Sequence, residues 1–132
     1  MKSRISILLA VLALMIAVLA CGAPAGVSNI YMANDEAGNN KTTTFAPSDT
    51  VYVFFDVNQI DAGTKFQIKW YVLNVDGQDP NEPLAVTDYD YNNEATILAH
   101  IESTGDGLPV GNYKVEIYMS GNKVGEQLFS VQ

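Results

Sequence analysis

Apolar and polar residues alternate with a period of two along most of the chain after residue 26. The clearest run spans residues 50–58, and its members on one face are all apolar: Val51, Val53, Phe55 and Val57. The run 65–74 alternates in the same way and places Trp70 on its apolar face. Because successive side chains of a strand point to opposite faces of a sheet, both runs predict strands with one buried face.

Six further segments are short, rich in β-branched and aromatic residues, and separated by turn-forming residues. They cover residues 27–33, 42–45, 84–87, 95–102, 112–120 and 124–131. Residues 120–123 (Ser-Gly-Asn-Lys) are typical of a tight hairpin between the last two segments. No segment after residue 26 sustains helical periodicity. The pattern therefore predicts an all-β chain of seven or eight strands, which is typical of a β-sandwich.

The beginning of the chain follows a different pattern. Lys2 and Arg4 precede an apolar run over residues 5–20, in which Ser6 is the only polar side chain. A basic start followed by an apolar run is typical of an export signal peptide. A helix of this length rises about 24 Å, which is short against a hydrocarbon core of roughly 30 Å. The run therefore favours a cleaved signal over a permanent membrane span.

Cys21, the only cysteine, directly follows the apolar run, in the sequence Val-Leu-Ala-Cys at residues 18–21. This motif resembles the lipobox of bacterial lipoproteins. The resemblance implies that a diacylglyceryl group is attached to the Cys21 thiol and that cleavage occurs before this residue. The chain would then be exported and held at the cell membrane or cell surface, because two or three acyl chains anchor a protein stably. An ordinary signal peptide cut after Gly22 or Ala23 is the alternative.

These features divide the chain into a signal peptide (1–20), a lipidated cysteine with a short flexible tether (21–26) and one β-sandwich domain (27–132). The whole chain has seven basic and fifteen acidic residues, a net charge of −8. Loss of Lys2 and Arg4 with the signal leaves five lysines against fifteen acids, or −10. This charge argues against nucleic acid as a partner. The expected partners are the membrane, through the lipid on Cys21, and an envelope protein or glycan.

Residues 108–115 (Leu-Pro-Val-Gly-Asn-Tyr-Lys-Val) resemble the start of strand F in immunoglobulin-like and fibronectin type III-like domains. The resemblance implies that Tyr113 forms a tyrosine corner, in which its hydroxyl bonds to upstream backbone. It also implies that Trp70 is the buried tryptophan of strand C. The segment 113–131 is similar to the last two strands of many bacterial surface domains of this class. We therefore expect an immunoglobulin-like antiparallel β-sandwich, a fold that hosts binding, adhesion and spacer roles alike.

Patterns for catalysis or metal binding are sparse. His100 is the only histidine, and with Cys21 committed to lipid no histidine–cysteine set can bind zinc. No serine lies in a nucleophile-elbow pattern, so we expect neither an enzyme nor a cofactor. Acidic side chains fall in two expected loops, with Asp76, Asp79 and Glu82 in the first and Asp88 and Asp90 in the second. Because the first loop lacks the spacing of an EF-hand, its three acids are weak candidates for calcium.

Aromatic side chains give the most specific surface prediction. If Trp70 faces the core, then Tyr71 and Leu73 face outward, and so does Tyr118 on the neighbouring strand, which predicts an exposed contact face. Other aromatic side chains expected at the surface are Tyr52, Phe54, Tyr89 and Tyr91. Large apolar side chains should leave little room for a pocket. The sequence thus favours a non-catalytic binding or structural module of the envelope, with a solute- or calcium-binding lipoprotein as the alternative.

Overall fold

The computed structural model describes residues 25–132, and the predicted signal peptide and Cys21 lie outside the described residues. Within that range the chain forms eight strands and no helix. The strands are β1 (Gly26–Ala33), β2 (Thr44–Phe45), β3 (Val51–Asn58), β4 (Lys65–Val72), β5 (Ala85–Asp90), β6 (Thr96–Ile101), β7 (Gly111–Met119) and β8 (Asn122–Val131). The prediction of an all-β domain with seven or eight strands is confirmed.

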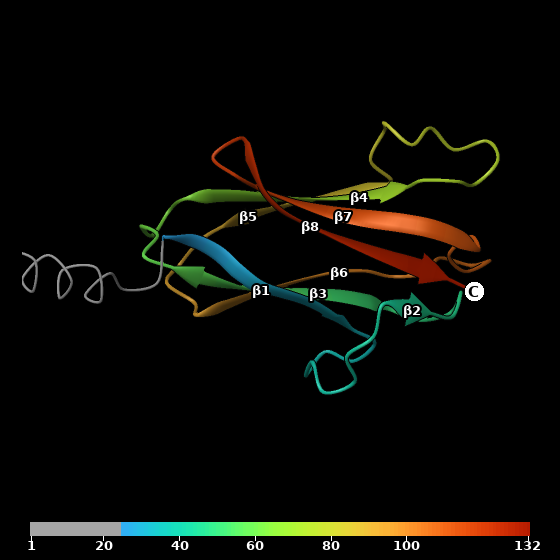
Figure 1. Cartoon of the computed structure of the whole chain (residues 1–132), viewed down its shortest axis with the longest axis horizontal. Helices are drawn as coiled ribbons and strands as arrows, with labels where there is room; N and C mark the ends of the chain where they lie inside the picture. The colour runs from blue at the N-terminus through green and yellow to red at the C-terminus, as the bar shows by residue number, and fades with distance from the viewer. Residues whose placement is uncertain (1–24) are drawn as a thin grey trace, which may run out of the picture.

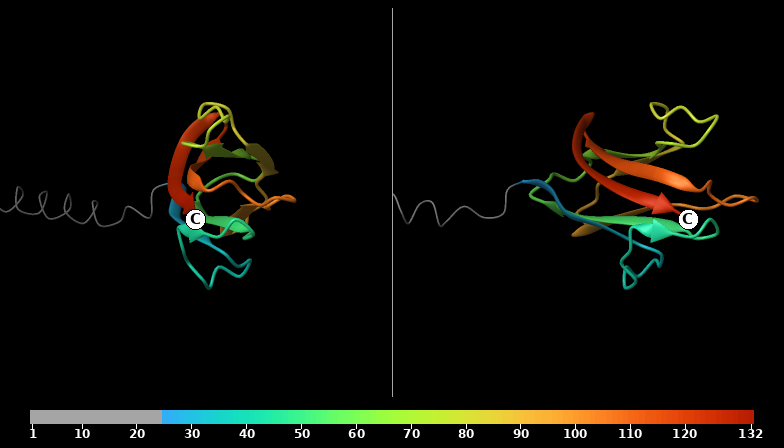
Figure 2. Two further views of the ribbon diagram at one scale, coloured as in Figure 1. Left: turned by 90° about the vertical axis from the view of Figure 1, so that its right-hand side faces the viewer. Right: turned by 45° about the vertical axis from the view of Figure 1, so that its right-hand side comes forward.

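The strands form two sheets that face each other across the core (Figure 1). One sheet has the order β1-β3-β6, and the other has the order β2-β8-β7-β4-β5. Neighbouring strands are antiparallel except for β2, which runs parallel to β8. Figure 2 shows the same two layers from two further directions. The domain is therefore the predicted sandwich, with one short parallel pair that the sequence pattern did not indicate.

The two long edges of the sandwich differ. At one edge the chain leaves β1 in the three-stranded sheet and joins the other sheet as β2, where Thr44 pairs with Ser130 and Phe45 with Val131. The backbone N–H of Ser130 also donates to the carbonyl of Thr43 at 2.9 Å. At the other edge β5 and β6 end the two sheets, and no described strand crosses between them. One edge is therefore tied by backbone hydrogen bonds, and the other is open.

The alternating strand directions collect the loops at two ends of the sandwich. The N-terminal end, where β1 begins, carries the segments 59–64 and 91–95 and the turn at 120–121. The C-terminal end, where β8 finishes, carries the segments 34–43, 46–50, 73–84 and 102–110. The longer loops thus lie at the end of the domain that is opposite to the first described residues.

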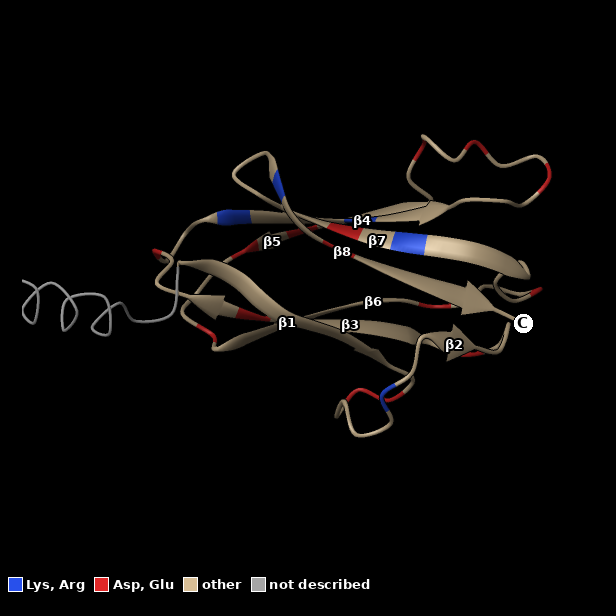
Figure 3. Ribbon diagram, in the orientation of Figure 1, with Lys and Arg blue, Asp and Glu red and all other residues tan. Residues whose placement is uncertain are grey.

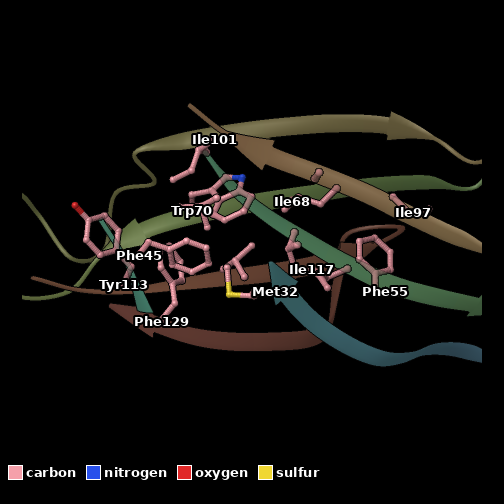
Figure 4. Packing of buried hydrophobic residues seen from close by; sticks show 14 of the residues in the cluster. Met32, Phe45, Phe55, Ile68, Trp70, Ile97, Ile101, Tyr113, Ile117 and Phe129 are labelled. Atoms are coloured by element: carbon pink, nitrogen blue, oxygen red, sulfur yellow. The ribbon is translucent and has the colours of Figure 1, made fainter. Parts of the chain in front are cut away.

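Aromatic side chains fill the core between the sheets (Figure 4). Trp70 is fully buried and meets the ring of Phe129 edge-on, with 6.0 Å between ring centroids and 82° between planes. Phe45 meets Phe129 edge-on from β2, and Tyr113 stacks on it at 5.1 Å. Removing such side chains from water supplies about 1.5–3 kcal/mol each. The faces predicted to be apolar on β3 and β4 are the faces that form this core.

The prediction that Asp88 and Asp90 lie in a loop is wrong. β5 extends to Asp90, so both acids lie on a strand and point outward from it. Aspartate is a poor strand former, but each one here has a partner directly opposite on β4. Gln67 Nε2 donates to Asp88 at 2.9 Å, and Lys65 Nζ donates to Asp90 at 2.8 Å. These cross-strand contacts explain why the strand continues through an acidic sequence.

Candidate functional site

The predicted contact residues lie on the outer face of the five-stranded sheet, on the side away from the core. Cross-strand pairs on β4 and β7 form the middle of this face: Gln67 with Tyr118, Lys69 with Glu116, and Tyr71 with Lys114. Leu73, Lys123 and Leu128 complete what we call the outer face. The sheet register therefore brings Tyr71, Leu73 and Tyr118 onto one surface, because alternate residues of neighbouring strands share a side.

Glu116 is the electrostatic centre of the outer face. Only 6 % of the residue is exposed, yet its carboxylate lies 3.2 Å from Lys114 Nζ and 3.1 Å from Lys123 Nζ. Tyr118 Oη donates a third contact at 3.1 Å. Burial opposes ionisation of Glu116, but the hydrogen bonds from Lys123, Lys114 and Tyr118 outweigh it and hold the pKa below its usual value. The sequence analysis missed Glu116. The pattern that could have indicated it is an acidic residue between Lys114 and Tyr118 on the same, outward side of one strand.

Two lysine side chains lie over the tyrosine rings of the outer face. Lys69 Nζ lies 4.5 Å from the ring centroid of Tyr118, and Lys114 Nζ lies 5.0 Å from that of Tyr71. An ammonium group over an aromatic face is attracted by the ring quadrupole. The rings are therefore held in place by their neighbours on the sheet.

This packing corrects the predicted exposure of Tyr71. Its direction away from the core is as expected, but only 8 % of the residue is exposed. Leu73 and Tyr118 are half-buried. The apolar surface that does reach solvent comes from Leu128, which is 56 % exposed. Leu73 and Leu128 line an open hollow of about 390 Å³ at the C-terminal end of the outer face. The accessible part of this face is therefore centred on the two leucines rather than on Tyr71.

The outer face of the other sheet is also more covered than predicted. Tyr31 stacks on Phe54 with 4.8 Å between centroids and 4° between planes, and Lys41 Nζ lies 4.1 Å from the Tyr31 ring. Gly38 lies against the same two rings, where a Cβ atom would stand 2.9 Å from Tyr31 Oη. Phe54 is consequently only 6 % exposed instead of outward and open. The loop 34–41 folds over these rings, which alternation along β3 could not indicate.

The acidic residues proposed for calcium do not come together. Asp76, Asp79 and Glu82 lie in the loop 73–84, where Asp79 Oδ1 accepts a hydrogen bond from the backbone of Asn81 at 2.8 Å. Among residues 25–132, no three histidine, cysteine, aspartate or glutamate side chains are grouped so that they could hold a metal ion. These acids instead belong to a wider pattern of charge at this end of the domain.

Charge is distributed unevenly over the domain (Figure 3). The segments at the C-terminal end contain eight acidic residues and one lysine, Lys41. The acids are Asp35, Glu36, Asp49, Asp76, Asp79, Glu82, Glu102 and Asp106. The other four lysines of the described residues lie on the five-stranded sheet: Lys65, Lys69, Lys114 and Lys123. The C-terminal end is therefore strongly negative, and the positive charge of the domain is concentrated on the outer face.

A cleft at the open edge corrects the expectation that the sandwich leaves little room for a pocket. Its volume is about 460 Å³, and it lies between the start of β5 and the end of β6. The loop 102–110 closes it at the C-terminal end through Leu108 and Pro109. Large side chains do fill the space between the sheets, but they leave the open edge unfilled because no strand bridges it.

The solved structures that are similar to this chain include the following two. An immunoglobulin-like protein (PA1606) from Pseudomonas aeruginosa shares 16 % sequence identity with a TM-score of 0.57, covering 84 % of this chain and 100 % of that one. The soluble domain of PmoD from Methylocystis sp. ATCC 49242 (Rockwell) shares 9 % identity with a TM-score of 0.55, covering 85 % of this chain and 95 % of that one. No model of a known protein family matches the chain, and no curated sequence matches it.

These similarities establish the fold. The domain is an immunoglobulin-like β-sandwich, as the residues around Tyr113 and Trp70 implied. At identities this low the likeness concerns architecture, and function has to be argued from the site itself. Within residues 25–132 no helix is long and apolar enough to cross a membrane.

Proposed function

We propose that this chain is an exported lipoprotein, anchored to the membrane by a lipid on Cys21, whose immunoglobulin-like domain binds an envelope protein or glycan without catalysis. The observation that carries the binding role is the outer face. Leu73 and Leu128 offer apolar surface there, and Tyr71 and Tyr118, each with a lysine over its ring, lie along the same face. Contact surfaces in proteins are enriched in aromatic side chains such as these tyrosines.

The sequence at residues 18–21 supports the anchor. The four residues 22–25 between Cys21 and the start of β1 reach at most about 14 Å when extended. A lipid on Cys21 would therefore keep the N-terminal end of the sandwich close to the membrane. The acidic C-terminal end would point away from it, and the outer face would stand at the side of the domain, where an envelope partner can reach it.

The anchor is tested by a Cys21→Ala substitution in the full chain, with growth in labelled palmitate. We expect the unmodified chain to incorporate the label and to stay in the membrane fraction, and the variant to lose both. The mass of the mature protein separates the alternatives, because lipidation predicts a chain that begins at acylated Cys21. A mature chain that begins at Ala23 or Pro24 without label would refute the anchor.

The outer face is tested separately, by a photo-reactive amino acid placed at single positions in intact cells. Leu128 reports on the outer face, and Leu98, which is 36 % exposed on the three-stranded sheet, is the matched control. We expect a discrete cross-linked product from position 128 that is absent from position 98. The double variant Tyr71→Ala, Tyr118→Ala should reduce that product. Identical products from both positions would contradict a binding role for this face.

A further inference from the structure

One side of β5 carries backbone groups that pair with no other strand of the described residues. β5 pairs with β4 alone, at the open edge of the five-stranded sheet. The backbone N–H of Tyr91 donates to the carbonyl of Thr64 at 2.9 Å, which continues the β4–β5 register. Because the direction of the backbone groups alternates along an antiparallel strand, the odd-numbered residues of β5 bond to β4. The backbone N–H and C=O groups of Val86, Asp88 and Asp90 therefore point away from β4, towards the open edge.

β5 lacks most of the features that close a sheet edge to further strands. Such features are proline, a bulge, a very short strand or a charge that points inward. The outer strand β1 has a register shift between Ser28 and Tyr31, and β2 is only two residues long. β5 contains no proline and pairs with β4 without a register shift, and its inward residues, Ala85, Thr87 and Tyr89, are uncharged. Its backbone can therefore accept a further strand.

Charge determines which strand can be added. The outward residues of β5, Val86, Asp88 and Asp90, are all exposed, and Figure 3 shows the acidic stretch on this strand. Asp90 is paired with Lys65 at 2.8 Å. Asp88 bonds to the neutral amide of Gln67 and forms no ion pair with any described residue. Opposite charges at facing positions stabilise a sheet and like charges destabilise it, so an added strand needs basic side chains beside these acids.

The same acids argue against a second copy of this chain as the added strand. Two antiparallel β5 strands can pair all three residues of each open edge only in one register. That register sets Asp88 of one copy directly opposite Asp88 of the other, which is unfavourable. Each chain also has a net charge of −8, so two copies repel each other. The partner strand therefore belongs to a different, basic segment.

The open edge also offers apolar surface to an added strand. Leu84 and Val86 are 43 % and 45 % exposed. Leu84 and Ala85 border the cleft that Ile101 and Leu108 line from the other side. Side chains of an added strand alternate between the outward side, beside the acids of β5, and the inward side, which faces the cleft. Basic residues are thus favoured on one side of the added strand and apolar residues on the other.

We propose that the open edge of β5 binds an extended segment of another protein, in which basic and apolar residues alternate, as an antiparallel sixth strand of the sheet. Main-chain hydrogen bonds to Val86, Asp88 and Asp90 hold this segment, and its basic side chains lie beside the two acids. The inference goes beyond the proposed function, because it concerns the edge of the sheet and not the outer face. It is also independent of the lipid anchor.

A short peptide of alternating lysine and valine with blocked ends is the probe. It is titrated into the ¹⁵N-labelled full chain in a non-ionic detergent. An amide proton that gains a hydrogen bond moves downfield, so we expect the amide resonances of Val86, Asp88 and Asp90 to move downfield in a saturable manner. Leu98 has the equivalent position on the open edge of β6, where the outward side chains carry no carboxylate, and its resonance should stay in place.

Three modified peptides separate backbone pairing from charge. In an antiparallel pair the lysine residues of the probe direct their backbone N–H groups at β5, and the valine residues direct theirs away. Methylation of the lysine backbone nitrogens should therefore abolish binding, whereas methylation of the valine backbone nitrogens should leave it nearly unchanged. The peptide with glutamate in place of lysine keeps the alternation and reverses the charge, so it should not bind measurably.

Two pairs of variants locate the site on the protein. Asp88→Asn should weaken binding of the lysine peptide about threefold, since solvent screens an exposed charge, and Asp76→Asn in the loop 73–84 should not change it. Val86→Pro removes one N–H group from the open edge and leaves the bonds to β4 in place, so it should weaken binding about fivefold. Leu98→Pro makes the same change on β6 and should have no effect. The amide spectrum without peptide verifies that each variant is folded.

Several outcomes would overturn the proposal. These are amides of Val86, Asp88 and Asp90 that the lysine peptide does not move, movement confined to β6, and equal affinity for the glutamate peptide. Equal loss of binding on methylation of lysine and of valine nitrogens would exclude antiparallel pairing. Downfield movement of the same three amides with protein concentration, in the absence of peptide, would show that a second copy occupies the edge and would refute a basic partner.

Discussion

The hydroxyl of Tyr113 donates a hydrogen bond of 2.5 Å to the carbonyl of Pro109, four residues earlier in the chain. This bond joins β7 to the loop 102–110 that precedes it. Burial raises the pKa of Tyr113 above its ordinary value, so the hydroxyl keeps its proton for this bond across the physiological range. The contact is the one that a tyrosine corner requires, and it fixes the path of the chain into β7.

Tyr113→Phe removes this bond while keeping the ring that stacks on Phe129. It leaves the carbonyl of Pro109, an exposed residue, without this partner, so the free energy of unfolding should fall by about 0.5–1.5 kcal/mol, the net value of one hydrogen bond. Urea unfolding followed by tryptophan fluorescence measures the change. Tyr52→Phe is the control, because the hydroxyl of Tyr52 has no hydrogen bond to any described residue, and it should change stability little. Equal losses in the two variants would deny the bond a structural role.

Glu116→Gln tests the buried carboxylate of the outer face. Its pKa is lowered in the folded domain, so its contribution to stability is present above the ordinary value of 4.5 and is lost as the pH falls below it. We expect the variant to lose about 1 kcal/mol at pH 7, and the difference from the parent to shrink towards pH 3. Glu126→Gln, a more exposed partner of Lys123, should cost less. A difference that stays constant with pH would contradict this account.

Gly125→Ala tests the close approach of β1 to β8. A Cβ atom at residue 125 would overlap the Cδ1 atom of Ile30. The substitution should therefore destabilise the domain by about 1–3 kcal/mol. Ile30→Val removes that Cδ1 atom, so in the double variant the two losses should be less than additive, a coupling that thermal or urea unfolding of all four proteins measures. Simple additivity would show that the overlap is relieved in another way.

Glu94→Gln tests the contact that raises the pKa of Tyr89 in the folded domain. A hydrogen bond to Glu94 raises the pKa of Tyr89 to about 12, from an ordinary value of 10.0. The unfolded chain loses this proton first, so the stabilisation is complete below pH 10 and is lost between pH 10 and about 12. Absorbance at alkaline pH should show a late step among the seven tyrosines, and the variant should move one of them earlier. An unchanged titration curve would exclude the contact.

Most of the fold follows from the alternation of apolar and polar residues with a period of two. Alternation located the eight strands and identified Trp70 as a core residue, because the side of a strand that faces the core must be apolar along its length. Alternation also gave the correct direction for Tyr71. It could not give its exposure, since exposure depends on the side chain of Lys114, which lies 43 residues away in the chain and reaches the ring only across the sheet.

The parts that were missed depend on contacts between distant segments. The segment 42–45 was predicted as a strand, but its parallel pairing with β8 was not, because that pairing is set by backbone hydrogen bonds that any residues can make. Asp88 and Asp90 are strand residues because of Gln67 and Lys65 opposite them. The cleft lies where no described strand connects β5 to β6. The alternation pattern of a single segment cannot predict it, because the cleft depends on how the two sheets are placed.

The difference between the two edges predicts where the two sheets separate most easily. Separating the sheets beside β1 and β2 would strain the chain that joins the two strands and break the backbone hydrogen bonds between residues 43–45 and β8. Separating β5 from β6 disturbs side-chain packing, and the loop 91–95 restrains only the N-terminal end of that edge. We therefore expect the two sheets to separate first at the C-terminal end of the open edge, near Leu84, Ile101 and Leu108.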